Sequence, residues 1–287
     1  MLLASLVLVM LVVPIGCDRG DAPPTTTTTA TDRPRLASAS PAATDILLHL
    51  RASLPEDADL AEIVAVSRYD TATSVSDLPR VGDYLTLDFE QLAAADPDTL
   101  IVQVSPEKMP PEAVRRAEAM GMNLLHLQID SLADIEAAVG TLGGAMQYGS
   151  HAAVAAFRDE LGPAAATADG PRALVVLDSD FSFAAGQGNY LDDLLAHAGL
   201  TNAVPSTMAS WPTLDDEAMR SLSPEAVVLI LPGATDAQLA QARTRFAQVA
   251  GEWDVAWDEV IVLRDPYAMV PGWSVTKVAA AMRGAIQ

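Results

Sequence analysis

The sequence predicts an α/β protein of two similar lobes, each a mainly parallel sheet flanked by helices, joined by one long helix. A chain of 287 residues that is 50% hydrophobic can bury enough surface for two units of ordinary size. Short, continuous apolar runs alternate with helical patterns, which is typical of parallel strands buried on both faces. One phrase also occurs twice, LDFEQLAAADPDTLIV at 87–102 and LDDEAMRSLSPEAVVL at 214–229, and the two copies align without a gap.

The first 16 residues, MLLASLVLVMLVVPIG, are apolar but too few for a spanning helix of about 20 residues. They precede Cys17, the single cysteine, so an intrachain disulfide is excluded. The segment resembles a bacterial lipoprotein signal peptide, which implies that 1–16 is removed and Cys17 is lipidated. The alternative is a secretory signal with an incidental cysteine. Residues 17–33 are polar and rich in Thr and Pro, which predicts a flexible tether.

The N-terminal lobe is expected at 34–148. Its strands are predicted at four short apolar runs: RLASAS, EIVAVS, TLIVQV and LLHLQI. Helical spacing of apolar residues predicts helices near ATDILLHL, DFEQLAAA and PEAVRRAEAM. This order of elements predicts a parallel sheet with helices on its faces.

The linking helix is expected at 149–167, because apolar residues recur at helical spacing from about 149 to 161 and GPAAATADGP then ends the pattern. The C-terminal lobe, 168–287, repeats the plan of the first. Its strands are predicted at ALVVLD, AVVLIL and VIVLRD, and its helices at YLDDLLAHA, DDEAMRSL, TDAQLAQARTRFAQVA and SVTKVAAAMRGAI. A single packed helix between lobes is stiff and predicts limited closure.

A second repeat supports the duplication, because DILLH at 45–49 matches DLLAH at 193–197. We interpret His49 and His197 as helix-surface residues paired with the aspartate four positions earlier rather than as metal ligands. His126 and His151 also lack the spacing of metal ligands, so no metal site is predicted.

The net charge of −21 argues against a nucleic-acid-binding function, because phosphate contacts need clustered Lys or Arg and the sequence has no basic stripe. Enzyme classes also fit poorly. SASPAAT lacks the G-x-S-x-G context of a serine hydrolase, and GQGNYLDD is not the G-x-G-x-x-G of a dinucleotide-binding turn. We therefore predict that the protein is not an enzyme.

Five segments in the same order carry a resemblance to a known family. They are PRLASASPAATDILLHL, LPRVGDYLTLDFEQLAAADPDTLIV, FAAGQGNYLDDLLAHAGLTNAV, WPTLDDEAMRSLSPEAVVLILPG and the last strand with its following PG. Over about residues 33–287 the chain is similar to class III periplasmic substrate-binding proteins of ABC importers. The resemblance implies a monomer, anchored in the periplasm or at the cell surface. It implies that the monomer captures a small metal chelate (cobalamin, a ferric siderophore or haem) and delivers it to a permease dimer with its ATPase. The chelate is a transported ligand, and no cofactor is expected.

In this family one glutamate on each lobe docks against arginines of the permease. The matching positions are Glu90 and Glu217, each in the first turn of a predicted helix, where the macrodipole favours a carboxylate. The alternative is that both are ordinary helix-start charges.

Ligand binding is expected in the cleft between the lobes, at loops that follow the strands. Aromatic side chains suit the broad apolar face of a metal chelate. The candidate ligand-binding residues are Ser40, Pro41, Tyr69, Tyr84, Phe183, Trp211, Asp265 and Tyr267. The resemblance matches Phe183, Trp211 and Asp265 to positions that cobalamin receptors use, but VSPEK lacks the tryptophan and DPYAMVPGW the arginine that such receptors carry. The chelate therefore stays open, and a receptor fold reused as a sensor or structural lipoprotein is the alternative function.

Overall fold

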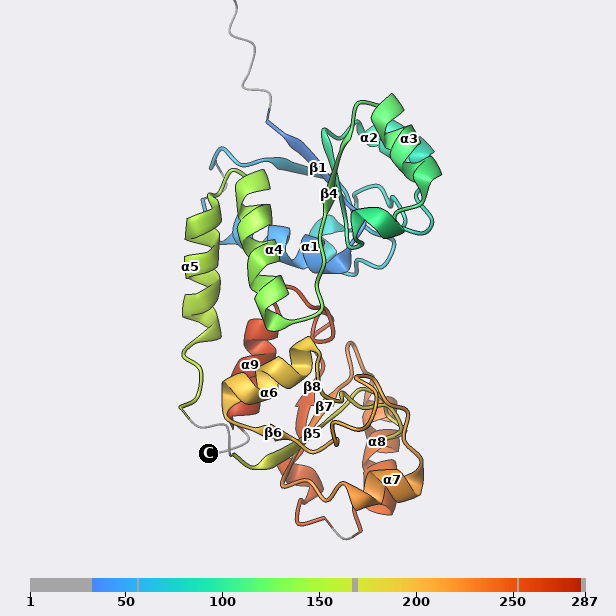
Figure 1. The fold of residues 1–287 in the computed structure, drawn as a ribbon, viewed down its shortest axis with the longest axis vertical. Coiled ribbons are helices and arrows are strands. Elements are labelled where there is room, and N and C mark those ends of the chain that lie inside the picture. Colours follow the sequence, from blue (N-terminus) through green and yellow to red (C-terminus); the bar gives the residue numbers. More distant parts are fainter. Residues whose placement is uncertain (1–32, 56, 167–169, 252, 285–287) are drawn as a thin grey trace, which may run out of the picture. The chain divides into compact units, whose positions relative to one another are not determined.

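The structure is a computed structural model that describes residues 33–55, 57–166, 170–251 and 253–284 (Figure 1). Cys17, the predicted signal peptide and all of the predicted tether except Arg33 lie outside the described residues. Within the described part, no helix combines the length and apolar character needed to cross a membrane.

The N-terminal lobe is built on a four-stranded parallel sheet with the strand order β2-β1-β3-β4. Its helices alternate with the strands along the chain, as the apolar pattern predicts. The elements are β1 (Arg35–Ser38), α1 (Pro41–Ala52), β2 (Glu62–Ala65), η1 (Thr73–Val75), α2 (Phe89–Ala95), β3 (Thr99–Val102), η2 (Pro106–Lys108), α3 (Pro111–Ala119), β4 (Asn123–His126) and α4 (Leu132–Ala145).

The C-terminal lobe repeats this topology with a four-stranded parallel sheet of order β6-β5-β7-β8. Its elements are β5 (Arg172–Val176), α6 (Tyr190–Ala198), β6 (Thr201–Asn202), α7 (Asp216–Ser221), β7 (Ala226–Ile230), α8 (Asp236–Val249), η3 (Trp257–Glu259), β8 (Ile261–Leu263) and α9 (Val275–Gly284). The predicted fold class of two parallel-sheet α/β lobes is confirmed. The sequence prediction missed β6, which is only two residues long and has no apolar run.

The repeated phrase has a structural role in each lobe. The Asp98 carboxylate accepts the backbone N–H of Arg35 at 2.8 Å, and the matching Glu225 carboxylate accepts that of Arg172 at 2.9 Å. The two arginine side chains in turn donate to carbonyl groups at the ends of α2 and α7, groups that the helix itself leaves unpaired. In each lobe the acid therefore joins the start of the first strand to the start of the third strand. The arginine side chain donates a hydrogen bond to the C-terminal end of the helix that precedes the third strand.

Two helices, not one, lie in the segment between the sheets. α5 (Ser150–Leu161) occupies most of the predicted linking helix, and α4, to which the sequence analysis assigned no helix, packs along it (Figure 1). The close approach depends on Gly143, where a Cβ would lie 2.4 Å from the Cβ of Ala153. α5 also contacts α9, so it packs against elements of both lobes.

Hydrogen bonds between the lobes involve the aspartates of the repeated segments DILLH (45–49) and DLLAH (193–197). Asp45 on α1 accepts the backbone N–H and the hydroxyl of Ser274, just before α9, at 2.7 and 2.8 Å. Asp193 on α6 accepts the backbone N–H of Leu132, the first residue of α4, at 2.8 Å. Each aspartate therefore satisfies an unpaired N–H at the start of a helix that follows the last strand of the other lobe.

The predicted pairing of these aspartates with histidines on the same helix is wrong. Because Asp45 is buried against Ser274, His49 instead stacks on Trp273, with ring centroids 4.2 Å apart, and lies 3.1 Å from a Glu160 carboxylate oxygen. Glu160, on α5, also accepts the Trp273 indole N–H at 2.8 Å. The Nε2 atom of His197 lies 3.1 Å from the carbonyl oxygen of Gly162.

Buried side chains from both lobes form one continuous core. It includes Ile46 of α1, Phe157 of α5, Leu191 of α6 and Val278 of α9. Separate apolar clusters lie under α2 and α3 in one lobe and under α7 and α8 in the other. Because apolar burial is the main stabilising contribution, the lobes are joined by packing as well as by the chain.

Candidate functional site

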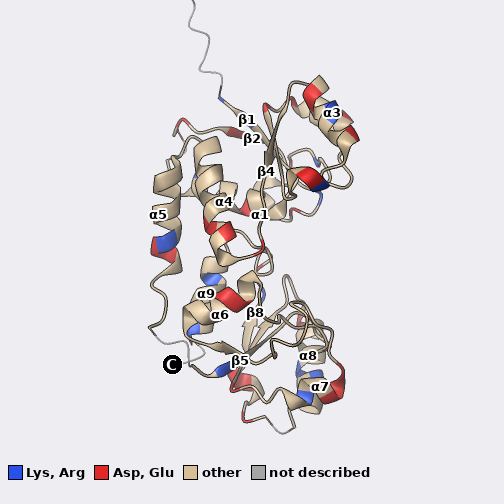
Figure 2. Cartoon of the chain, viewed as in Figure 1, with Lys and Arg blue, Asp and Glu red and all other residues tan. Residues whose placement is uncertain are grey.

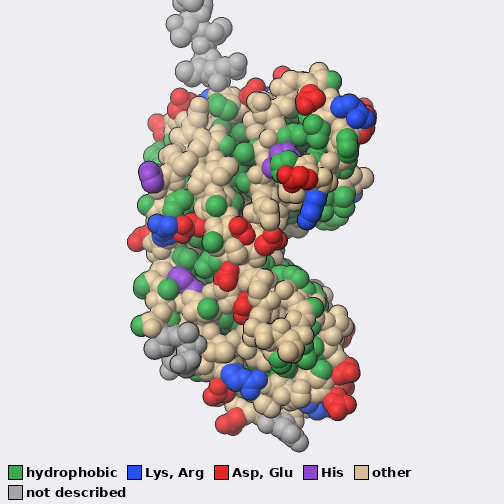
Figure 3. Space-filling model, viewed as in Figure 1, with side chains coloured by type: hydrophobic (Ala, Val, Ile, Leu, Met, Phe, Trp, Pro, Cys, Tyr) green, Lys and Arg blue, Asp and Glu red, His purple; other side chains and the backbone are tan. Residues whose placement is uncertain are grey.

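A pocket of about 450 Å³, here called the cleft pocket, takes its walls from both lobes. Ile129 and Asp130 come from the loop after β4, and the remaining residues come from the C-terminal lobe. The lining residues are Ile129, Asp130, Gly188, Asn189, Tyr190, Ser210, Trp211 and Pro271. The surface is hollowed between the lobes in Figure 3. The pocket lies at loops that follow parallel strands, where the sequence analysis expects ligand binding.

Trp211 supplies the main aromatic surface of the cleft pocket. Its side chain is large and apolar, yet the residue is 41% exposed. Its ring centroid lies 6.4 Å from that of Phe183 and 6.1 Å from that of Tyr190. The three rings form a cluster in which Tyr190 is buried, Phe183 is half-buried and the indole borders the pocket.

The Gly-rich turn GQGN holds the segment that carries Trp211. A Cβ at Gly186 would lie 2.3 Å from the carbonyl oxygen of Ala209, so only glycine lets the two segments approach this closely. Asn189 caps α6 and donates its side-chain amide to the carbonyl oxygen of Ser210 at 2.8 Å. The turn that superficially resembles a nucleotide-binding motif therefore positions the tryptophan.

A smaller pocket of about 170 Å³, here called the side pocket, opens in the N-terminal lobe and shares Ile129 and Asp130 with the cleft pocket. Most of its residues follow β3 and β4. They are Tyr84, Gln103, Val104, Ser105, Lys108, Leu127, Gln128, Ile129 and Asp130. The side pocket is lined by two charged residues, Lys108 and Asp130. Asp130 accepts a hydrogen bond from the Gln128 side-chain amide at 3.2 Å. Lys108 has no carboxylate oxygen within 4 Å among the described residues.

Two of the predicted ligand-binding residues, Ser40 and Pro41, lie at the start of α1. Ser40 is 1% exposed and caps α1, and its hydroxyl donates to Oε1 of Gln103 at 2.8 Å. This bond fixes the amide oxygen of Gln103, a residue that lines the side pocket. Pro41 is the first residue of α1, where its fixed φ and missing N–H suit a helix start.

Asp265 and Tyr267 belong to a polar contact between the lobes. Asp265 accepts the backbone N–H of Tyr267 and the ammonium group of Lys277, both at 2.9 Å. The Tyr267 hydroxyl lies 3.4 Å from a carboxylate oxygen of Asp70, on the other lobe. Burial raises the pKa of Asp70 to about 6 and that of Tyr267 to about 12. Neither Asp265 nor Tyr267 lines the cleft pocket or the side pocket.

Of the eight predicted ligand-binding residues, Trp211 lines the cleft pocket and Tyr84 the side pocket, while Phe183 packs behind Trp211. Tyr69 is 62% exposed, lies next to the Arg68 guanidinium at 5.3 Å from its ring, and lines neither pocket.

The prediction missed polar residues directly after the strands. Gln103 follows β3, and Gln128 and Asp130 follow β4. A polar residue at the end of an apolar run was the available signal, because parallel strands place their carboxyl ends at one edge. No group of three or more metal-ligating side chains occurs among the described residues.

The predicted docking residues occupy matching places. Glu90 lies in the first turn of α2, which Asp88 caps by accepting two backbone N–H groups at 3.0 Å. Glu217 lies in the first turn of α7, which Asp215 caps by accepting the Ala218 N–H at 2.8 Å. Both glutamates are exposed, and neither side chain makes a hydrogen bond or ion pair with the described residues.

Comparison with known proteins identifies the fold. A family model described as periplasmic binding protein matches residues 36–244. A periplasmic haem-binding protein from Pseudomonas aeruginosa is 24% identical, with a TM-score of 0.65 over 88% of this chain and 92% of that chain. A periplasmic haem-binding protein of Vibrio cholerae is 21% identical, with a TM-score of 0.64 over 88% of this chain and 97% of that chain. A periplasmic vitamin B12 binding protein of Vibrio cholerae is 18% identical, with a TM-score of 0.62 over 88% of this chain and 96% of that chain. No curated protein matches the chain.

Proposed function

Because this chain belongs to the periplasmic binding protein family, we propose that it is the substrate-binding protein of an ABC importer. It captures cobalamin, a ferric siderophore or haem between its lobes and delivers it to a permease dimer with its ATPase. The observation that carries this proposal is the cleft pocket, which joins residues of both lobes and is bordered by the exposed indole of Trp211. The family consists of binding proteins of transporters, so the chain is not an enzyme.

The chemistry of the two pockets supports a flat ligand with a polar rim. An indole face offers a broad apolar surface for a macrocycle or an aromatic chelate. The side pocket adds hydrogen-bond donors at its edge, from Lys108 and from the Gln103 amide that Ser40 orients. The solved relatives named above bind haem and vitamin B12, which are metal chelates of this kind.

Delivery is assigned to Glu90 and Glu217. Both are exposed and lie at the starts of helices whose caps set their direction. Two matched carboxylates, one on each lobe, suit a permease with two subunits that each present an arginine. The protein is proposed to act as a monomer, tethered through a lipid on Cys17 in the periplasm or at the cell surface.

The first test is a spectroscopic titration of the purified protein with ferric protoporphyrin IX, cyanocobalamin and a ferric catecholate. We expect a shifted absorption spectrum and saturable binding with one of the three. Absence of binding to all of them would reject the proposed ligand class.

The second test measures ATPase stimulation and uptake with the permease in reconstituted vesicles. Glu90→Ala with Glu217→Ala is expected to abolish stimulation without changing chelate affinity, and each single change to give a partial loss. Full stimulation of the ATPase by the double variant would reject the docking role and show that both glutamates are ordinary charges at helix starts. Chelate binding without any stimulation by the wild-type protein would favour the sensor function.

A further inference from the structure

A basic groove lies beside Glu90 on the N-terminal lobe of this acidic protein. We call it the arginine groove. It encloses about 560 Å³ and is lined by Arg68, Arg80, Gly82, Thr86, Leu87, Asp88, Phe89, Glu90 and Arg116. The net charge of the chain is −21, yet three of its 17 basic side chains meet in this groove.

Two of the three arginines form no ion pair with a carboxylate of the described residues. Arg68 forms an ion pair with Asp83 at 2.6 Å. Arg80 donates to the carbonyl oxygen of Ser67 at 3.4 Å, and Arg116 lies over the ring of Phe89, 4.1 Å from its centroid. Among the described residues, no carboxylate oxygen lies within 4 Å of Arg80 or Arg116.

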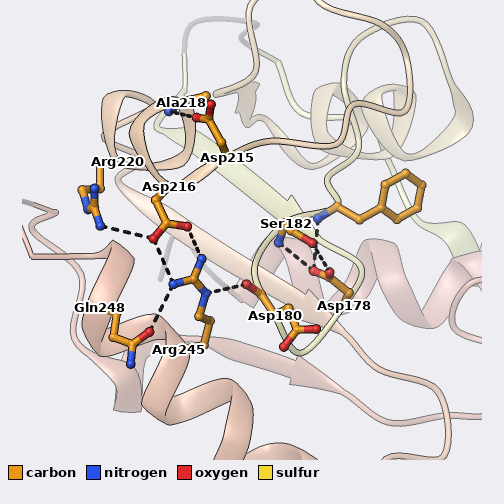
Figure 4. Close-up of polar contacts among 10 residues, drawn as sticks. Asp178, Asp180, Ser182, Asp215, Asp216, Ala218, Arg220, Arg245 and Gln248 are labelled. Atoms are coloured by element: carbon orange, nitrogen blue, oxygen red, sulfur yellow. Dashed lines mark hydrogen bonds and ion pairs between the residues drawn. The ribbon is translucent and has the colours of Figure 1, made fainter.

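In the C-terminal lobe, the position that matches Phe89 carries an acidic residue, which pairs with the arginines around it. Where the first repeat has Phe89, the second has Asp216. Figure 4 shows the Asp216 carboxylate between Arg245 of α8 and Arg220, with which it forms ion pairs, and the Arg245 side chain also donates to the Asp180 carbonyl oxygen. The hydrogen bonds from Arg245 lower the pKa of Asp216. The two arginines beside Glu217 therefore share one carboxylate of their own lobe. Acidic and basic segments lie together on α7 and α8 in Figure 2.

Arg80 and Arg116 affect any docking through Glu90, although Asp70 lies near enough to Arg80 to interact with its charge. A permease arginine that approaches Glu90 also approaches Arg80 and Arg116, and like charges repel across an interface. A carboxylate on the permease, placed in the arginine groove, removes this repulsion and forms charge-assisted hydrogen bonds with planar guanidinium groups.

We propose that the arginine groove binds an acidic side chain of the permease, next to the permease arginine that pairs with Glu90. This inference rests on the proposed function and adds a second contact, of reversed sign, on the N-terminal lobe only. It predicts that the two lobes bind the permease by different sets of charges, although the glutamates match.

The experiment compares Arg116→Gln with Arg115→Gln. Arg115 is the adjacent residue of α3, is also exposed, and pairs with Glu112 outside the groove. The two variants remove the same charge from the same helix, so a general effect of net charge on association is equal in both. Affinity is measured against the permease and ATPase in phosphatidylcholine nanodiscs, and circular dichroism with thermal melting checks that each variant is folded.

We expect Arg116→Gln to weaken binding about tenfold and Arg115→Gln by less than about twofold, because an interfacial charge pair couples more strongly than an exposed one. Arg116→Lys keeps the charge but not the planar guanidinium group, and is expected to retain more of the affinity than Arg116→Gln. Unchanged or tighter binding of Arg116→Gln would overturn the inference, and tighter binding would mean that Arg116 only repels the permease arginine. Arg116-dependent binding to nanodiscs of anionic lipid without permease would assign the groove to lipid phosphate and also overturn it. If wild-type protein does not bind the permease, the proposed function itself fails.

Discussion

Asp45 gives the clearest link between one buried group and the stability of the connection between the lobes. The residue is 9% exposed, and its carboxylate accepts two hydrogen bonds from Ser274. Burial raises its pKa from 3.8 to about 6, against the opposing effect of those hydrogen bonds. A folded-state pKa above the unfolded value means that the folded protein binds a proton at pH 5 that the unfolded chain does not bind.

The raised pKa of Asp45 makes the stability of the protein depend on pH. Between pH 7 and pH 5 the folded state gains protonation at Asp45, so the free energy of unfolding should rise by about 1 kcal/mol as the pH falls. Asp70, whose pKa is also raised to about 6, contributes in the same direction. The pKa of His49 is lowered by burial, so this histidine opposes the trend as the pH falls through 6.5. Carboxylates with lowered pKa, such as Asp83 and Asp216, lose stabilisation only at more acidic pH.

The assay is urea unfolding at pH 7, 6 and 5, followed by tryptophan fluorescence, for wild type and Asp45→Asn. The asparagine is nearly isosteric and cannot titrate, while His49 and Asp70 remain in both proteins. We expect the difference in unfolding free energy between the two proteins to change by about 1 kcal/mol between pH 7 and pH 5, in favour of wild type at pH 5. A difference that stays constant with pH would show that Asp45 is not protonated in this range and would refute the reasoning.

Three further predictions concern the site and its support. Trp211→Ala should weaken chelate binding by about ten- to a hundredfold, since truncating a buried aromatic contact typically costs about 1–3 kcal/mol; equal affinity in calorimetric titration would remove Trp211 from the site. Gly186→Ala should lower the melting temperature and weaken chelate binding together, because its Cβ would lie 2.3 Å from the Ala209 carbonyl oxygen; Gly251→Ala, where a Cβ meets nothing within 4 Å, is the control. Cys17→Ser should block lipidation and processing of the precursor, and a variant that stays in the membrane fraction with unchanged processing would reject lipidation.

The sequence predicted the sheets well because their strands are apolar and continuous, as in the buried run Ala226–Ile230. It also located matching glutamates, since an ungapped repeat preserves helix starts. It did not predict α4, whose several glycines and alanines give a weak apolar pattern, although Ser131 forms a capping box with Asp134.

The candidate site was predicted less completely than the fold. Ser40 and Asp265 lie in the expected loops, but their side chains bond to Gln103 and Lys277 within the protein. Position after a strand identifies the edge of a sheet and not the direction of a side chain. Contacts between residues far apart in the chain, such as Asp70 with Tyr267, decide which loop residues stay available for a ligand, and no local pattern encodes them.

Asp45 and Asp193 each bond to the start of a helix of the other lobe. This pattern has the form of an isologous interface, in which residue i of one subunit meets residue j of the other and the reverse contact also exists. Asp45 reaches Ser274 at the start of α9, and Asp193 reaches Leu132 at the start of α4, the equivalent helix. The chain thus contains within itself the contacts of a two-fold dimer. The two contacts differ in strength, because Asp45 accepts two hydrogen bonds from Ser274 and Asp193 accepts one from Leu132. Separating the lobes therefore costs more at the contact between α1 and the start of α9 than at the contact between α6 and the start of α4.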